Sequence, residues 1–180
     1  MTPQEAYAKA RAEGPSDLTR NAVLCDLKYA YNYARDVDKC PRNDTRNAVL
    51  SSPEYAYMYS KYVDKCPRDD TRNAVLSESW YAYWYARYVE GPRDDTRNAA
   101  VKDPECAYLY ARYADKCPRD DTRKASLSDS DCAYIYAVNV DKCWRLDTWK
   151  VAVDVEGPMP FEYSLEWLTL DDIPDTMSLT

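Results

Sequence analysis

Apolar and small residues between Ser52 and Lys65 recur with the period of an α-helix. They fall at positions i, i+3, i+4 and i+7, namely Ala56, Tyr59, Ser60 and Val63. Ser52 is a favourable N-cap, Pro53 suits the first helical position, and Cys66-Pro67 marks the end of the segment. The pattern predicts a helix from Pro53 to near Lys65 with one buried stripe.

A shorter helical segment precedes this one, and the two recur together. Asp44 can N-cap a helix from Thr45 to about Leu50. The threonine of this segment returns at spacings of 26, 26, 25, 26 and 26 residues, at Thr19, Thr45, Thr71, Thr96, Thr122 and Thr148. A Tyr-x-Tyr core accompanies the first five of them, so the chain holds five full units. Each unit is predicted to be a helical hairpin.

Hairpins of this size must stack to be stable, because helices of about 6 and 13 residues cannot bury a core alone. We therefore expect an all-α fold, an α-solenoid of five hairpins with a period of about 26 residues. A half-repeat at Thr2–Glu13, helical from Pro3 onward, precedes them. The expected division is 1–153 for the repeats and 154–180 for an acidic C-terminal cap, which can be a helix or a β-hairpin.

The units also carry a recognisable motif, in the stretches DPECAYLYARYADK, SPEYAYMYSKYVDK and SESWYAYWYARYVEG. Over residues 16–150 the chain resembles bacteriophage-encoded proteins with tandem repeats of about 25 residues, of the type Pro-Glu-x-Ala-Tyr-x-Tyr-Ala-Arg-Tyr-Val. The resemblance implies an α-solenoid from a phage, acting in the bacterial cytoplasm on a host or defence component. Cys106, Cys132, Trp149 and the C-terminal tail depart from the motif.

Tyrosine is far commoner than phenylalanine, with 18 Tyr against 1 Phe. A thin repeat array explains this bias, because a tyrosine ring can be buried while its hydroxyl reaches water or a polar partner at the edge. Tyr57 lies on one flank of the predicted stripe, and Tyr55 and Tyr62 lie on the other. We expect these rings to pack between neighbouring repeats.

The chain has no histidine, which excludes Ser-His-Asp, Cys-His and His-metal chemistry. Four of the seven cysteines occupy one repeated position, at Cys40, Cys66, Cys117 and Cys143. Stacked units about 8 to 10 Å apart are too distant for disulfides between these equivalents. We expect free, reduced and mostly buried thiols, with no metal and no cofactor.

The charges are unevenly divided between the repeats and the tail. All 24 Lys and Arg residues precede residue 151, where an equal number of acids balances them, and the tail accounts for the net charge of -7. The candidate acidic binding residues of the tail are Glu162, Glu166, Asp171, Asp172 and Asp175. The tail is interpreted as a polar terminal cap or as an acidic element aimed at a basic site on a partner. Both roles are compatible.

Two arginine ladders run through the repeats. The first comprises Arg20, Arg46, Arg72, Arg97 and Arg123, and the second comprises Arg42, Arg68, Arg93, Arg119 and Arg145. Acids lie within a few residues of each, so we expect ion pairs and helix-end hydrogen bonds between repeats; a partner contact is the alternative. A net basic surface for nucleic acid is not expected.

The side of the long helices opposite the stripe is predicted to point away from the core, yet it carries apolar residues. The candidate partner-binding residues are Met58, Trp80, Trp84, Arg87, Leu109, Arg112 and Ile135, with Lys61 at the same edge. Apolar residues with basic edges are typical of interface cores. The alternative is that the tail or a second copy covers this strip, so a homo-oligomer stays open.

These patterns favour binding over catalysis. The first hypothesis is a non-enzymatic inhibitor or adaptor that engages a host or defence protein in the cytoplasm. The alternatives are a nucleic-acid mimic that uses the acidic tail and, least favoured, a carboxylate-based enzyme. No apolar run approaches the roughly 18 residues of a membrane span, and the N-terminus lacks a signal-peptide core, so membrane association is not expected. Direct nucleic-acid binding is not expected either, because acids balance the basic residues of the repeats.

Overall fold

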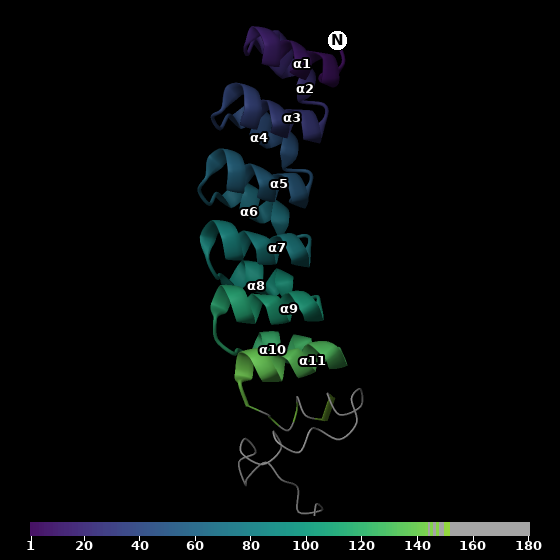
Figure 1. The fold of residues 1–180 in the computed structure, drawn as a ribbon, viewed down its shortest axis with the longest axis vertical. Coiled ribbons are helices and arrows are strands. Elements are labelled where there is room, and N and C mark those ends of the chain that lie inside the picture. The colour runs from purple at the N-terminus through teal and green to yellow at the C-terminus, as the bar shows by residue number, and fades with distance from the viewer. Residues whose placement is uncertain (144, 146, 148–149, 152–180) are drawn as a thin grey trace, which may run out of the picture. The chain divides into compact units, whose positions relative to one another are not determined.

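The computed structural model describes residues 1–143, 145, 147, 150 and 151, and in this range the chain is helical without strands (Figure 1). Helix pairs pack in the same way repeat after repeat, as expected for an α-solenoid of hairpins, which confirms the predicted fold class. The chain divides into two compact units, residues 1–99 and the residues from Ala100 onward, which the sequence did not predict. Each unit is described by itself.

The first unit alternates long and short helices. Its helices are α1 (Pro3–Glu13), α2 (Asp17–Val23), α3 (Leu27–Tyr33), α4 (Asn43–Val49), α5 (Pro53–Tyr59), α6 (Asp69–Val75) and α7 (Ser79–Tyr85). Three of them continue as π-helical turns, η1 (Ala34–Asp38), η2 (Ser60–Asp64) and η3 (Ala86–Glu90). Helix α8 (Asp94–Ala100) runs across the boundary.

The second unit repeats the same elements. It contains α9 (Pro104–Tyr110), η4 (Ala111–Asp115), α10 (Asp120–Ser126), α11 (Ser130–Tyr136) and η5 (Ala137–Asp141). Helix α10 packs against both α9 and α11. Residues 147, 150 and 151 are also helical, where the short-helix segment recurs for the sixth time.

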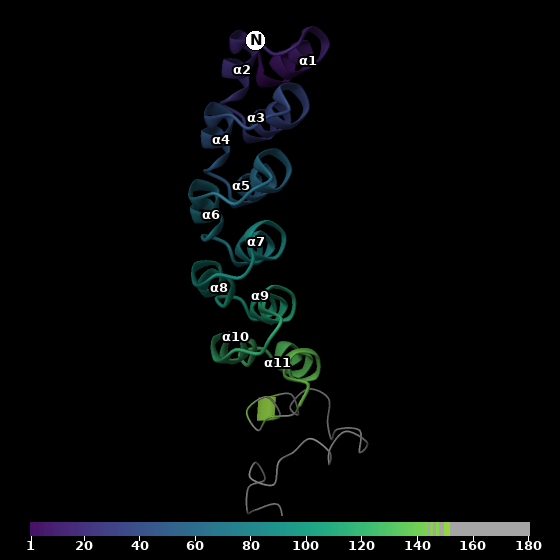
Figure 2. The ribbon, with the colours of Figure 1, turned by 90° about the vertical axis from the view of Figure 1, so that its left-hand side faces the viewer.

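Within residues 1–99, each short helix contacts the two long helices that flank it in the chain. Helix α4 contacts α3 and α5, and α6 contacts α5 and α7. Figure 2 separates the two kinds of helix, with α2, α4 and α6 on one side of this unit and α3, α5 and α7 on the other. The N-terminal α1 takes the place of a long helix and packs on α2 and α3, so the predicted half-repeat is confirmed.

The N-cap of α5 follows the sequence prediction, whereas that of α4 does not. The Ser52 side chain accepts a hydrogen bond from the Tyr55 N–H, and Pro53 is the first residue of α5. Helix α4 begins at Asn43 with Arg42 as its N-cap, so the predicted N-cap role of Asp44 is wrong. Asp44 lies inside the first turn, where its carboxylate accepts from the N–H of the next residue at 2.8 Å.

Every long helix of the repeats widens in its last turn, which the sequence pattern did not indicate. After Tyr59 the chain adopts π-helical geometry, and the Lys65 N–H donates to the Ser60 carbonyl at 2.8 Å. Lys65 then ends the helix in the left-handed region, with φ of 56°, and Lys39, Lys116 and Lys142 do the same. The helical axis therefore extends to Asp64, close to the predicted end, but the side chains of the last turn are rotated relative to an ordinary α-helix.

The single 25-residue spacing has a local explanation. The third repeat replaces Lys65-Cys66-Pro67 by Gly91-Pro92, one residue fewer. Gly91 has φ of 99°, which strongly favours glycine, and its N–H closes the π-turn on the Ala86 carbonyl at 2.9 Å. The shorter loop therefore preserves the helix ending while removing one residue.

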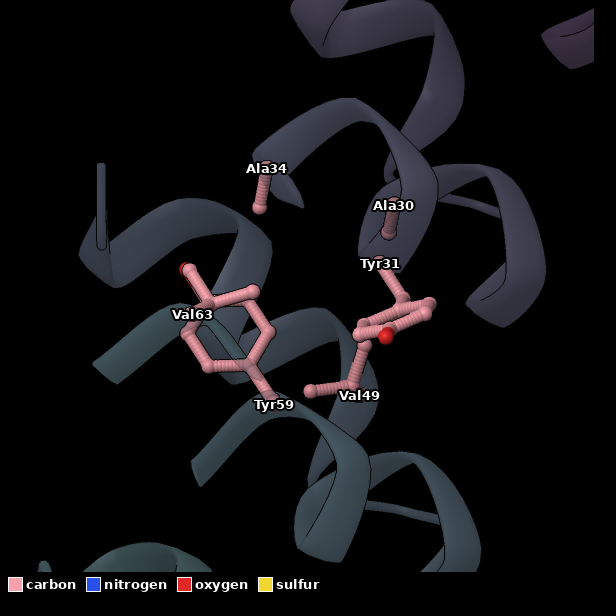
Figure 3. Close-up of a cluster of buried hydrophobic side chains, with 6 residues drawn as sticks. All are labelled: Ala30, Tyr31, Ala34, Val49, Tyr59 and Val63. Carbon is pink, nitrogen blue, oxygen red and sulfur yellow. The ribbon is translucent and has the colours of Figure 1, made fainter. Parts of the chain in front are cut away.

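The predicted stripe forms the core between neighbouring hairpins. Figure 3 shows one such cluster, in which Val49 of α4 lies among side chains of two long helices, namely Ala30, Tyr31, Ala34, Tyr59 and Val63. All six are buried. Tyr59 also bridges to the short helix, because its hydroxyl lies 2.9 Å from Thr45 Oγ1 and donates to the Arg42 carbonyl at 3.1 Å. Equivalent tyrosine–threonine bridges join Tyr33 to Thr19, Tyr85 to Thr71 and Tyr136 to Thr122.

The second unit uses smaller core residues. Ser126 stands where α4 has Val49, and its hydroxyl donates to the Thr122 carbonyl. Cys106 and Cys132 replace the tyrosine found in the earlier repeats, and both thiols are buried. The smaller residues keep the same hairpin packing because α9, α10 and α11 still contact one another.

The C-terminal predictions fall largely outside the described residues. These comprise the cap at residues 154–180, its helix or strand character, and the acidic candidates Glu162, Glu166, Asp171, Asp172 and Asp175. Among the helices in the described part of the chain, none combines the length and apolarity needed to cross a membrane.

Candidate partner-binding surface

Met58 and Trp84, two of the predicted strip residues, fill the seam between long helices of the first unit. Both side chains are half-buried and pack against the cluster around Val75 and Tyr85. The Trp84 ring lies 5.7 Å from that of Tyr57 and 5.4 Å from that of Tyr81, centroid to centroid. The expectation that these positions point away from the core is therefore wrong, because each long helix is flanked closely by the next.

Leu109 and Ile135 occupy the corresponding seam of the second unit. Both are half-buried against the cluster of Tyr108, Ala111, Tyr136 and Val140. Their exposed area is limited, so they contribute to packing in the same way as Met58 and Trp84.

Trp80 is the most accessible of the apolar strip residues. It lies in the first turn of α7 and is 37% exposed. Its ring makes edge contacts with Tyr83 and Trp84, at centroid distances of 6.5 and 6.0 Å. Trp80 is thus an exposed aromatic side chain supported from behind by rings that are themselves fixed in the seam.

Two tyrosines of the π-turns join Trp80 as exposed aromatic residues. Tyr62 is 47% exposed and Tyr88 is 48% exposed. The prediction that Tyr62 packs between repeats is wrong, since it lies in η2, where the widened turn changes the direction of the side chain. The same prediction is confirmed for Tyr55, whose ring packs 6.1 Å from that of Tyr31 in the preceding repeat.

Each exposed π-turn tyrosine follows a basic residue that is held by another tyrosine. Lys61 Nζ donates to the Tyr57 hydroxyl at 2.9 Å and lies 5.2 Å from the Tyr62 ring centroid. Arg87 donates to the Tyr83 hydroxyl, and its guanidinium lies 4.9 Å from the Tyr88 ring. The hydrogen bond that Lys61 donates to Tyr57 raises the pKa of Lys61, so this residue is cationic at neutral pH.

The same arrangement recurs outside this pair of repeats. In the second unit Arg112 donates to the Tyr108 hydroxyl and lies 5.0 Å from the Tyr113 ring. In the first unit Arg35 donates to the Tyr31 hydroxyl at 3.3 Å. The sequence shows this pair as Tyr-x-x-x-Lys/Arg, but the spacing alone does not indicate that the tyrosine hydroxyl holds the basic side chain.

The first arginine ladder is buried and paired with acids, which confirms its interpretation as ion pairs. Arg46 Nη2 lies 2.5 Å from an Asp64 oxygen. Arg20 pairs with Asp38, and Arg123 pairs with Asp141. These bonds join the short and long helices of one hairpin, so the expectation that they run between repeats is wrong for these three.

Arg72 differs from these three, because it has contacts in its own and in the following repeat. It donates to Glu90 at 2.7 Å within its hairpin, and its Nε lies 3.2 Å from an Asp95 oxygen of the next repeat. The second ladder forms exposed ion pairs with acids two residues later, such as Arg68 with Asp70 at 3.2 Å. Both ladders are therefore engaged with acids, and neither provides a field of unpaired arginines in the described residues.

The seven cysteines are free thiols. The prediction that most are buried is wrong: Cys25, Cys40, Cys66 and Cys117 are exposed, and Cys143 is partly exposed. The repeated cysteine follows the left-handed lysine that ends each helix, so it lies in the loop rather than on the buried stripe. Within the described residues, no group of three or more Cys, Asp or Glu side chains is arranged to hold a metal ion.

The candidate surface consists of the outer side of α5–η2 and α7–η3 in the first unit. It comprises Met58, Lys61, Tyr62, Trp80, Trp84, Arg87 and Tyr88, and we call it the tyrosine–cation surface. It has the composition of an interface, with aromatic anchors and basic side chains held by hydroxyls.

Comparison of the chain with protein-family models, with curated proteins and with solved structures gave no match.

Proposed function

We propose that the protein is a non-enzymatic binding module that contacts a protein partner through the tyrosine–cation surface. The observation that carries this proposal is the exposed ring of Trp80, which is backed by Trp84 and Tyr83. A large ring held by its neighbours loses little conformational freedom on binding, and tryptophan is enriched among residues that dominate binding energy. Trp80 is therefore the expected anchor.

The setting of this activity is proposed from the repeat motif. A phage-encoded protein of this kind would act in the cytoplasm of its bacterial host, as an inhibitor or adaptor that engages a host or defence protein. Partner binding, rather than turnover, is also in keeping with the way the buried charges of the described residues are used. Arg20, Arg46 and Arg123 hold their acids in ion pairs that fasten helices together.

An affinity experiment with a matched control tests the proposal. The immobilised full chain, the Trp80→Ala variant and the Leu18→Ala variant are each incubated with bacterial lysate, and captured proteins are identified by mass spectrometry. Leu18 is an exposed apolar residue of α2, on the short-helix side, and is 68% exposed. Each captured protein is then purified and titrated calorimetrically against the three chains.

A partner that binds through this surface loses about 2 kcal/mol or more of binding free energy with Trp80→Ala, the range of aromatic anchor residues. Its affinity for Leu18→Ala is unchanged. Equal binding to the wild type and Trp80→Ala would contradict the proposal.

A further inference from the structure

We infer that residues 161–168 of this chain pack on the outer side of α11–η5, against Ile135 and Val138, and close the end of the second unit. The side chains that make the contact include Phe161 and Leu165. The inference concerns a contact within the chain and does not depend on the proposed binding function.

The long helices of the first unit turn one side toward the hairpin that follows. The Tyr57 ring of α5 lies 5.7 Å from the ring of Trp84, which belongs to the next hairpin. One turn later, the Lys61 ammonium group lies 4.2 Å from the ring centroid of Tyr88 in the same hairpin. Positions equivalent to Tyr57 and Lys61 therefore face the next long helix.

In the second unit these positions are held by Tyr134 and Val138, on the last long helix of the described residues (Figure 1). The equivalent tyrosines of the four preceding repeats are all buried, namely Tyr31, Tyr57, Tyr83 and Tyr108. Tyr134 is only half-buried, and Val138 is 47% exposed. Apolar area therefore remains on the side that faces the next hairpin in an earlier repeat.

The last long helix has also lost both members of the tyrosine–cation pair. Val138 stands where the four preceding repeats have Arg or Lys, and Asn139 stands where three of them have Tyr. The Asn139 amide is turned back onto its own helix and donates to the Ile135 carbonyl at 2.9 Å. Ile135 and Val138 are three residues apart and share one face. A valine in place of a solvated cation suits a surface that is covered.

The N-terminal end of the chain is finished differently, which argues against a second copy stacked end to end. Helix α1 takes the first long-helix place and buries Ala6 and Ala10. Its exposed residues are polar or alanine, namely Gln4, Glu5, Ala8, Lys9, Arg11, Ala12 and Glu13. This side offers no large apolar side chain to Val138 of another copy. A segment of the same chain, acting as a terminal cap, is therefore the better occupant.

Residues 161–168 have the pattern that such a cap needs. They read FEYSLEWL, in which Phe161 and Leu165 are four residues apart. Residues at this spacing share a side in a helix and also in a strand. Glu162 and Glu166 have the same spacing and fall on a different side. Contact through Phe161 and Leu165 would therefore leave both carboxylates toward water.

The segment also begins close enough to reach this surface. Residue 151 belongs to the same unit as α11. Nine residues, 152–160, separate it from Phe161. An extended chain advances about 3.3 Å per residue, so these residues can span up to about 30 Å. Neighbouring packed helices lie only about 8 to 10 Å apart, so the connection is long enough.

Hydrogen exchange of the full chain, followed by mass spectrometry, tests the inference. A synthetic peptide of residues 156–172 supplies the exchange rates of the same amides without the repeats. Sedimentation velocity at the same protein concentrations reports the association state.

Four variants accompany the wild type. Val138→Lys introduces the residue found at the equivalent Lys61, and Val138→Ile keeps the position apolar. Asn98→Lys makes the same change in charge at an exposed residue of α8, where the next repeat also has Lys. Phe161→Ser/Leu165→Ser alters the segment itself. Circular dichroism and thermal melts establish that the repeats of each variant are folded.

We expect the amides of residues 161–168 to exchange about tenfold or more slowly than in the free peptide. Val138→Lys and Phe161→Ser/Leu165→Ser should each raise the rate about fivefold or more, whereas Val138→Ile and Asn98→Lys should change it by less than about twofold. Free-peptide rates in the wild type would overturn the inference. Protection that survives Val138→Lys would place the segment elsewhere and would also overturn it.

Photocrosslinking adds a measurement that does not depend on how Val138→Lys folds. p-Benzoylphenylalanine at position 138 should give a product within one chain that joins it to residues 161–168. The same group at position 124, an exposed residue of α10, should not give this product. A product that joins two chains, or protection seen only in a dimer, would assign the surface to a second copy and refute the inference.

Discussion

The ammonium group of Lys61 lies 4.2 Å from the centroid of the Tyr88 ring, which belongs to the following hairpin. This contact joins two repeats on their outer side, just as Val75 joins the same two repeats in the core. Cation–π contacts of this kind are worth about 0.5 to 1 kcal/mol at exposed sites, so they orient side chains more than they stabilise the fold. The tyrosine–cation surface is therefore ordered by the stacking of repeats.

Trp84 and Trp80 should separate stability from binding. Trp84→Ala removes a ring packed against Tyr57 and Tyr81, and we expect the free energy of unfolding to fall by about 2 to 3 kcal/mol. Trp80→Ala should change it by less than about 1 kcal/mol, because that ring is more exposed and has fewer neighbours. Urea denaturation of the two variants measures both values. Equal destabilisation would show that Trp80 is part of the core.

The tyrosine–threonine bridge predicts a large effect from one oxygen atom. Tyr59→Phe keeps the ring but leaves the buried Thr45 hydroxyl and the Arg42 backbone without this partner, at a cost of about 1 to 3 kcal/mol. Tyr59→Ala should cost about 3 to 5 kcal/mol. Tyr62→Phe, at an exposed position, serves as the control in thermal melts and should leave the unfolding temperature unchanged. A Tyr59→Phe protein as stable as the wild type would contradict the bridge.

The hairpin pattern was predictable because the i, i+3, i+4, i+7 spacing of Ala56, Tyr59, Ser60 and Val63 survives in the structure, where all four are buried. The π-turn was not, since Ser60–Asp64 fits an ordinary helix equally well and the distinguishing bond, from Lys65 to Ser60, is a backbone contact.

The candidate site was predictable in part. The outward position of Trp80 follows from its helical register, but the burial of Trp84 depends on how closely the next hairpin packs. The acid that each short-helix arginine binds could not be read from the sequence, because it depends on how the two helices of a hairpin pack, as Arg46 binds Asp64.

Buried tyrosines should make the protein sensitive to alkaline pH. Burial raises the pKa of Tyr59 and of Tyr136 above the value of about 10 found in unfolded chains. The folded state then holds these protons more tightly than the unfolded state, so their contribution to stability is complete below pH 10 and is lost as the pH rises through the raised values. Urea denaturation at stepped pH, with tyrosinate absorbance as a second signal, checks this. Stability that stays constant well above pH 10 would contradict it.

The cysteines should fall into two classes of reactivity. Burial raises the pKa of Cys132 to about 12, and it also raises the pKa of Cys106, so both thiols stay protonated and inaccessible at neutral pH. Cys25, Cys40, Cys66 and Cys117 are exposed and should react readily with iodoacetamide. Mass spectrometry of peptides after timed alkylation distinguishes the classes. Labelling of Cys106 in the native protein as fast as Cys66 would show that the second unit opens readily.

Site-specific photocrosslinking tests the central claim, that the outer side of α7 contacts a protein partner. p-Benzoylphenylalanine is placed at position 80 of the full chain, or at position 18 on the short-helix side, and each chain is irradiated in bacterial cells. We predict a discrete product of higher mass from position 80 that is absent from position 18. No product at position 80, or an equally abundant product at position 18, would contradict the account.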